Sequence, residues 1–98
     1  MEAHLARLGA DDRVTGIIVQ RPLPAQVPAR AVQAAIPAVK DVEGTNPANL
    51  GMVIYGRPTL LTCTALSVQA LIAESGLGLR GCEATLVGHS EIVGKPVA

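Results

Sequence analysis

The stretch between residues 83 and 96, E-A-T-L-V-G-H-S-E-I-V-G-K-P, constrains the fold of this chain more than any other. It begins with Glu83 to Val87, a run of mostly β-forming residues that predicts a buried strand. Gly88 permits a tight turn after that strand. Gly94 and Pro96 then predict the beginning of a helix, because the first helical turn leaves its N–H groups unpaired and tolerates proline. A strand, a turn and a helix in this order indicate an α/β protein.

Two polar residues, His89 and Ser90, lie between the glycine turn and the predicted helix. A helix N-terminus offers unpaired N–H groups and a partial positive charge, so this layout can hold a phosphate. The glycine spacing differs from G-x-G-x-x-G, which leaves two interpretations. The stretch is either a phosphate- or nucleotide-binding loop or an ordinary strand–turn–helix connection.

Composition excludes several classes of function. The 98 residues suit one small domain with a formal net charge of zero, so no basic surface for nucleic acid or membranes is expected. Tyr55 is the single aromatic residue, which argues against base stacking. No apolar run reaches the roughly 18 residues that span a bilayer, and the N-terminus does not resemble a secretory signal. Cys63 and Cys82 fit two reduced thiols of a cytoplasmic protein, or one disulfide.

Apolar residues at helical spacing, together with glycine and proline breaks, predict three further helices. The first ends near Leu8, with Gly9 at the C′ position after it. The second occupies residues 29–35 between Pro28 and Pro37, with Val32 and Ile36 buried. The third begins at an N-cap formed by Thr64 and ends at Gly76.

Polar residues follow the apolar run Val14 to Val19, which predicts a buried parallel strand. Gln20 comes directly after it, where ligands collect in open α/β sheets; the alternative is a glutamine that only caps the loop. Residues 21–24 carry two prolines and predict a rigid extended loop. The charged segment from Val39 to Gly44 is either a solvated loop or a carboxylate and an ammonium held near Gln20 in a cleft. Residues 45–51 predict turns, and residues 52–55 a short apolar segment.

Five motifs in one order give the chain a family resemblance. It resembles the bifunctional methylenetetrahydrofolate dehydrogenase/methenyltetrahydrofolate cyclohydrolase family over essentially its whole length. Each motif alone has modest specificity, and the five together are highly specific. They are G-I-I-V-Q-R-P-L-P (residues 16–24), K-D-V-E-G (residues 40–44), N-x-G (residues 49–51), T-C-T (residues 62–64) and G-H-S-E-I-V-G-K-P (residues 88–96).

The resemblance implies a one-carbon folate enzyme with NADP as cofactor, and with NAD as an alternative because His89 stands where the family has arginine. Such an enzyme oxidises 5,10-methylenetetrahydrofolate and hydrolyses the methenyl product to 10-formyltetrahydrofolate. The resemblance also implies an α/β fold class with two incomplete domains. Residues 1–43 would be the end of a catalytic α/β domain. Residues 44–98 would be a connecting segment and the start of a Rossmann-like NAD(P)-binding domain. A homodimer is implied for the full-length enzyme.

The resemblance further implies site residues on two sides of one crevice. Gln20 is the expected catalytic residue, beside the folate and a lysine of a Y-x-x-x-K motif. The substrate-binding residues implied are Gln20, Pro22, Leu23 and Glu43, and the cofactor-binding residues are Thr64, Gly88, His89 and Ser90. No metal site is expected.

Several departures from the family pattern leave two classes open. No Y-x-x-x-K motif precedes Gly16, and residue 98 falls inside the helix after the cofactor loop, so we expect an interior fragment or a truncated copy that has no turnover alone. Glu43 replaces aspartate, and His89 replaces an arginine whose charge is permanent. The other substitutions are Thr62 and Ala65 for two prolines and Arg21 for leucine. The chain is therefore part of an active enzyme or a non-catalytic remnant with weak nucleotide binding; a generic nucleotide-binding domain fits the motifs less well.

Overall fold

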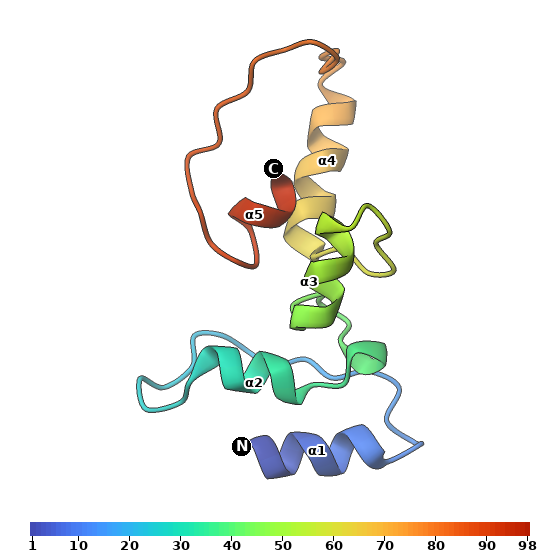
Figure 1. Cartoon of the computed structure of the whole chain (residues 1–98), viewed down its shortest axis with the longest axis vertical. Coiled ribbons are helices and arrows are strands. Elements are labelled where there is room, and N and C mark those ends of the chain that lie inside the picture. Colours follow the sequence, from blue (N-terminus) through green and yellow to red (C-terminus); the bar gives the residue numbers. More distant parts are fainter.

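The computed structural model describes residues 1–98 as an elongated, helix-rich molecule of 46 × 30 × 23 Å (Figure 1). Helices α1 and α2 lie side by side at one end, α3 lies in the middle, and α4 and α5 form the other end. None of the helices is long and apolar enough to cross a membrane. The elements are α1 (Glu2–Ala10), α2 (Ala29–Ala35), the 3₁₀ turn η1 (Ala38–Lys40), α3 (Pro47–Ile54), α4 (Cys63–Glu74) and α5 (Gly94–Val97).

The two predicted strands do not form a sheet. In residues 14–19 a single residue, Ile17, pairs in parallel with Asp41, and its N–H donates to the Lys40 carbonyl at 2.7 Å. Residues 83–87 are extended, exposed and unpaired. The prediction of two β-strands was therefore wrong for this chain, because β-forming residues make a ladder only where a neighbouring backbone offers its own N–H and C=O groups.

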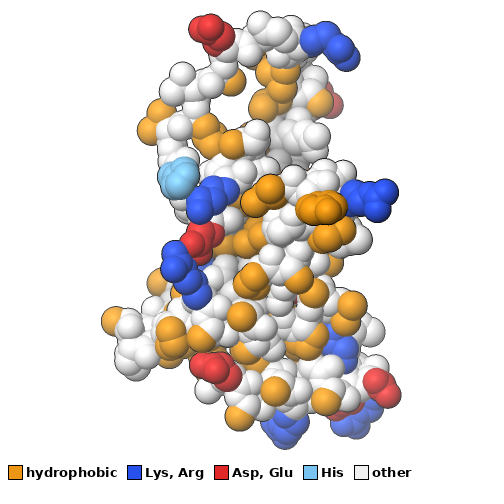
Figure 2. Space-filling model, viewed as in Figure 1, with side chains coloured by type: hydrophobic (Ala, Val, Ile, Leu, Met, Phe, Trp, Pro, Cys, Tyr) orange, Lys and Arg blue, Asp and Glu red, His pale blue; other side chains and the backbone are white.

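A small hydrophobic core lies between α1 and α2. Leu5, Ile17, Val32 and Ile36 are buried together, and Leu23 is among the half-buried side chains packed against them. Burial of Val32 and of the C-cap Ile36 confirms the prediction for α2, whose caps at Pro28 and Ile36 also follow the prolines. The other end of the molecule has little core, and hydrophobic side chains lie at the surface over α3 and α4 (Figure 2).

Two predicted helix boundaries need correction. Gly9 lies inside α1, not at C′: a Cβ there would come within 2.5 Å of the Pro37 ring, so its missing side chain admits close packing. Helix α4 begins at Cys63, and its N-cap is Thr62 instead of Thr64. The two threonines share the same capping preference, and sequence spacing did not separate them. The predicted end at Gly76 is confirmed by its φ of 70°, directly after the C-cap Ser75.

Residues 45–51 were predicted to be turns, but most of them form the first half of α3. Asn46 is the N-cap, with its Oδ1 accepting from the Ala48 N–H at 2.7 Å, and Pro47 occupies the first helical position. Asn-Pro is therefore a helix start here, the arrangement in which the missing proline N–H is harmless. The apolar residues 52–54 continue this helix.

A buried carboxylate fixes the start of α3. Asp41 is 1% exposed, and its Oδ2 accepts from the Asn46 N–H at 2.7 Å and from the Asn49 side-chain amide at 2.9 Å. The Asn46 side chain in turn donates to the carbonyl of Ile36, the C-cap of α2, at 2.7 Å. This Asp41 network joins α2, the paired residue Ile17 and α3 into one unit.

The backbone of Gly44 lies against the approach to α4. Its φ is 68°, and a Cβ there would lie 2.7 Å from both the C and O atoms of Leu61. We expect Gly44→Ala to lower the free energy of unfolding by about 2 kcal/mol, because strain from the left-handed backbone adds to the clash. Urea denaturation followed by circular dichroism measures the loss.

Gly56→Ala is the matched control for this prediction. Gly56 has nearly the same φ, 71°, but nothing lies within 4 Å of an added Cβ. That variant should show the backbone strain without the clash. Equal losses in the two variants would show that the Gly44–Leu61 contact contributes nothing.

Candidate functional site

The parallel pair of Ile17 and Asp41 positions two predicted site residues. Gln20 follows Ile17 by three residues and Glu43 follows Asp41 by two, so both lie beyond the same end of the pair. The Gln20 amide donates to the Arg21 carbonyl at 3.1 Å. The half-buried Glu43 carboxylate has no hydrogen bond or ion pair within the chain, and so its oxygens are available to donors of a ligand.

The two predicted substrate-binding residues of the loop after Gln20 differ in their exposure. Pro22 is exposed, whereas Leu23 is half-buried and packs against the core cluster. Leu23 therefore anchors the loop that follows Gln20, whose own side chain is exposed.

The other predicted group lies in the second half of the chain. Gly88 has a φ of 137° with nothing within 4 Å of an added Cβ, and His89 is exposed. Ser90 caps the start of α5: its Oγ accepts from the Val93 N–H at 3.0 Å and the Gly94 N–H at 3.3 Å. The hydroxyl proton of Ser90 remains free for a ligand.

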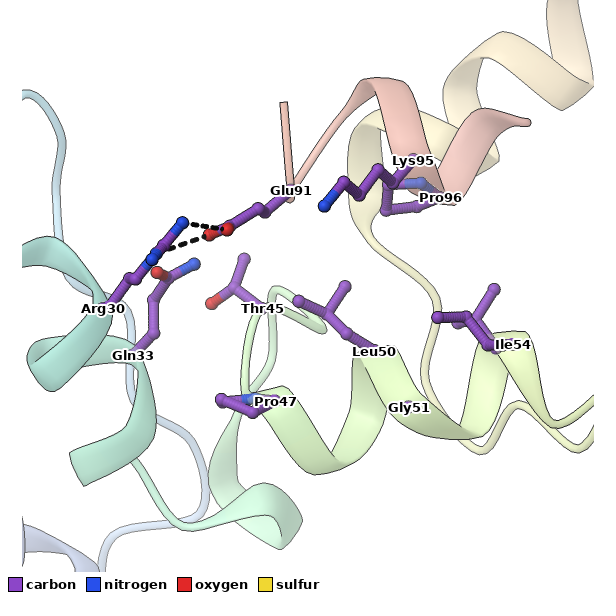
Figure 3. A pocket seen from close by; sticks show the side chains of 11 residues that line it. Arg30, Gln33, Thr45, Pro47, Leu50, Gly51, Ile54, Glu91, Lys95 and Pro96 are labelled. Carbon is purple, nitrogen blue, oxygen red and sulfur yellow. Dashed lines mark hydrogen bonds and ion pairs between the residues drawn. The ribbon is translucent and has the colours of Figure 1, made fainter. Parts of the chain in front are cut away.

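Thr64 is exposed in the first turn of α4. None of the predicted site residues lines the cavity between α2, α3 and α5 that Figure 3 shows.

An ion pair between distant parts of the chain closes one side of that cavity. The Arg30 guanidinium of α2 donates to both carboxylate oxygens of Glu91, with Nε–Oε2 at 3.2 Å (Figure 3). The Arg30 guanidinium holds the pKa of the Glu91 carboxyl below its ordinary value of 4.5, with a smaller effect from Lys95. The Arg30 side chain is 83% exposed and the Glu91 side chain 40%, so solvent screens the pair, which orients α2 and the α5 loop without contributing much stability.

Comparisons with known proteins cover the whole chain. A sequence profile of the tetrahydrofolate dehydrogenase/cyclohydrolase catalytic domain matches residues 1–43. The bifunctional protein FolD 2 of Mesorhizobium japonicum is 51% identical over all 98 residues, and that of Ruegeria pomeroyi is 50% identical over 97. The chain belongs to the tetrahydrofolate dehydrogenase/cyclohydrolase family. It spans about a third of the length of these curated relatives: 32% of the first and 33% of the second.

Solved structures of the family share the arrangement of this chain. The bifunctional FolD enzyme of Campylobacter jejuni is 38% identical with a TM-score of 0.90, and covers 99% of this chain with 35% of its own. The 5,10-methylenetetrahydrofolate dehydrogenase of the silkworm Bombyx mori is 33% identical with a TM-score of 0.93, and covers 99% of this chain with 34% of its own. The FolD of Trypanosoma brucei, solved with NADP cofactor and an inhibitor, is 33% identical with a TM-score of 0.88, over 99% of this chain and 33% of its own. These enzymes have α/β folds, and the fold class of the chain is therefore α/β. The chain by itself is helix-rich.

Sequence reasoning missed the most buried polar residue of this family member. Asp41, in K-D-V-E-G, was assigned to a solvated loop or an open cleft, but its carboxylate is buried and bonded to Asn46 and Asn49. A usable signal was present: an aspartate five residues before an Asn-Pro helix start has the N–H of that N-cap within reach.

The Arg30–Glu91 pair makes a testable pH prediction. We expect the Glu91 carboxyl, followed by NMR during an acid titration, to have a pKa below 4.5, and Arg30→Gln to move that pKa up toward 4.5. Because the lowered pKa belongs to the folded chain, the pair stabilises the fold above the ordinary pKa of glutamate and loses this effect as pH falls through the lowered value. An unchanged Glu91 pKa in the Arg30 variant would contradict the assignment.

Proposed function

We propose that this chain serves one-carbon folate metabolism as part of an NADP-dependent methylenetetrahydrofolate dehydrogenase and methenyltetrahydrofolate cyclohydrolase. The reaction oxidises 5,10-methylenetetrahydrofolate to the 5,10-methenyl form and hydrolyses that to 10-formyltetrahydrofolate. The observation that carries the proposal is the 51% identity to a bifunctional FolD protein over all 98 residues. Its free exposed thiols, Cys63 and Cys82, are compatible with a reducing cytoplasm.

The domain assignment is part of the proposal. Residues 1–43 would be the end of the folate-binding catalytic domain, and residues 44–98 a connecting segment with the start of a Rossmann-like NAD(P)-binding domain. Two observations support this division: the catalytic-domain profile matches residues 1–43, and α3 begins at Pro47 in the middle of the molecule.

On the substrate side, the chemistry of the side chains suits a folate. The unpaired Glu43 carboxylate can accept hydrogen bonds from the donor edge of a pterin. Pro22 and Leu23 would hold the loop against the ring, and the Gln20 amide would orient the substrate near the reacting carbon. Hydrolysis needs a water directed at that carbon, which is general acid–base work.

On the cofactor side, the residues present fit part of an NADP site. The open space beside Gly88 admits a phosphate close to the backbone, and the Ser90 hydroxyl can donate to it. Thr64 would face the nicotinamide, which accepts a hydride when bound. His89 supplies no permanent charge in place of the family arginine, so NAD is an alternative to NADP.

A second candidate function rests on the substitutions at positions 43 and 89. If His89 and Glu43 together abolish turnover, the chain is a non-catalytic remnant with weak nucleotide binding. An experiment separates the two: residues 1–98 replace the matching third of the Mesorhizobium japonicum relative, and NADPH formation from 5,10-methylenetetrahydrofolate is followed by absorbance. We expect an active chimera and no turnover by the 98-residue chain alone.

Controls make this experiment decisive. The unaltered relative, assayed in parallel, sets the reference rate. A folded but inactive chimera whose activity returns on His89→Arg or Glu43→Asp would support the remnant. A folded chimera inactive with every one of these changes would overturn the proposed function.

A further inference from the structure

A cavity of about 390 Å³ lies between α2, α3 and α5, and none of the residues assigned above to folate or cofactor lines it (Figure 3). Helix α3 forms its floor, α2 one wall and the loop and helix around Glu91 to Pro96 the other. Its volume is in the range of small-molecule sites, which are mostly apolar with a few placed polar groups.

The floor presents an apolar stripe with a gap in its middle. Pro47, Leu50, Gly51 and Ile54 line the cavity at i, i+3, i+4 and i+7 along one face of α3. An alanine side chain at Gly51 would meet nothing within 4 Å. Glycine inside a helix is less stable than alanine by about 0.5–1 kcal/mol, and no packing within this chain requires it. The gap above Gly51 is therefore room for a flat group lying on the helix backbone.

The rim of the cavity carries an excess of positive charge. Two cations, Arg30 and Lys95, face one anion, Glu91, and the Arg30 guanidinium is already bonded to that carboxylate. The Lys95 ammonium has no ion pair within 4 Å and in Figure 3 extends along the rim toward Glu91. A ligand anion at this rim would neutralise it.

A hydroxyl without a hydrogen bond adds a second polar contact. Thr45 is 7% exposed and lines the cavity, and its hydroxyl has no hydrogen bond within the chain. The neighbouring Gln33 amide is already engaged, since in its better orientation it donates to the Ala29 carbonyl and accepts from Arg21. The Thr45 hydroxyl is therefore free at the cavity surface, where a ligand can bond to it.

We infer that this cavity binds a small aromatic carboxylate. The ring lies on the α3 stripe over Gly51, the carboxylate meets the Lys95 ammonium, and a polar ring substituent reaches the Thr45 hydroxyl. The combination of one unpaired cation, an apolar floor and a space sized for a small molecule favours this ligand over a protein segment. The inference is independent of the proposed function, because it uses none of the residues assigned to folate or NADP.

The test is a titration of the ¹⁵N-labelled 98-residue chain with naphthalene-2-carboxylate, followed by NMR. We expect saturable shifts of the Leu50, Gly51 and Ile54 amides. Naphthalene-2-carboxamide, which lacks the charge, should bind about tenfold more weakly, and Lys95→Gln should remove this preference.

Two helix variants distinguish occupancy of the gap from loss of folding. Gly51→Leu fills the cavity floor and should reduce binding at least about tenfold while the helix is retained or stabilised. Ala48→Leu, on the same helix but outside the cavity, should leave binding unchanged.

Several outcomes would overturn the inference. They are an absence of saturation up to the solubility limit, equal binding of the carboxamide, and unaltered binding by Gly51→Leu. Shifts of the same amides that depend on protein concentration without ligand would also overturn it, because they would assign the cavity to a second copy of the chain.

Discussion

Replacement of Asp41 by alanine is expected to lower the free energy of unfolding by about 3 kcal/mol, the largest stability loss we predict for a single residue. Two charge-assisted hydrogen bonds disappear, and each is worth roughly 1.5–3 kcal/mol. The buried donors of Asn46 and Asn49 lose their acceptor. Part of this loss is offset, because Asp41 Oδ1 is itself buried without a hydrogen-bond partner and its removal is favourable.

Such a loss is large for a chain with 13 buried residues. Urea denaturation monitored by circular dichroism gives the free energy of unfolding. The matched control is Asp12→Ala, at an exposed aspartate that makes no hydrogen bond or ion pair. If both variants unfold at the same urea concentration as the parent chain, the Asp41 network does not hold α3 in place.

The second large effect concerns Gln20. In the chimera with the Mesorhizobium japonicum relative, we expect Gln20→Ala to lower kcat/KM for 5,10-methylenetetrahydrofolate about one hundredfold, the lower end of the contribution of a well-placed proton-transfer or orienting group. The reason is its position: Gln20 follows the Ile17–Asp41 pair and precedes a loop that Leu23 anchors to the core.

The control for this variant lies in the same loop. Gln26 is exposed and carries the same side chain, so Gln26→Ala should leave kcat/KM unchanged. Thermal unfolding of both variants checks that the chimera stays folded. A Gln20 variant that keeps full activity would remove Gln20 from the catalytic centre and leave Glu43 as the main folate contact.

The helices were the part of the fold most open to prediction. Pro28 lies directly before α2, Pro37 directly after its C-cap, and Gly76 directly after the C-cap of α4, because these residues act through their own backbone geometry. The same reasoning placed the end of α1 wrongly at Gly9. Gly9 is small because it packs against Pro37, a residue 28 positions away. Such contacts leave no local pattern.

The strands were less predictable for a different reason. Residues 14–19 and 83–87 have β-forming composition, but pairing depends on a partner backbone, and only Ile17 has one. The candidate site divides in the same way. Motifs predict Gln20, Glu43 and Gly88 as site residues, and these stay predictions. The cavity over Gly51 depends on how three helices meet, which the spacing along α3 alone does not specify.

The Asp41 network has a mechanical consequence. The same carboxylate is bonded to both ends of the first turn of α3, and its own backbone lies two residues before Glu43. We therefore expect a change in the tilt of α3 to displace Asp41 and, with it, the backbone around Glu43. A molecule bound above Gly51 that tilts α3 is thus expected to change the surroundings of the Glu43 carboxylate without contacting it.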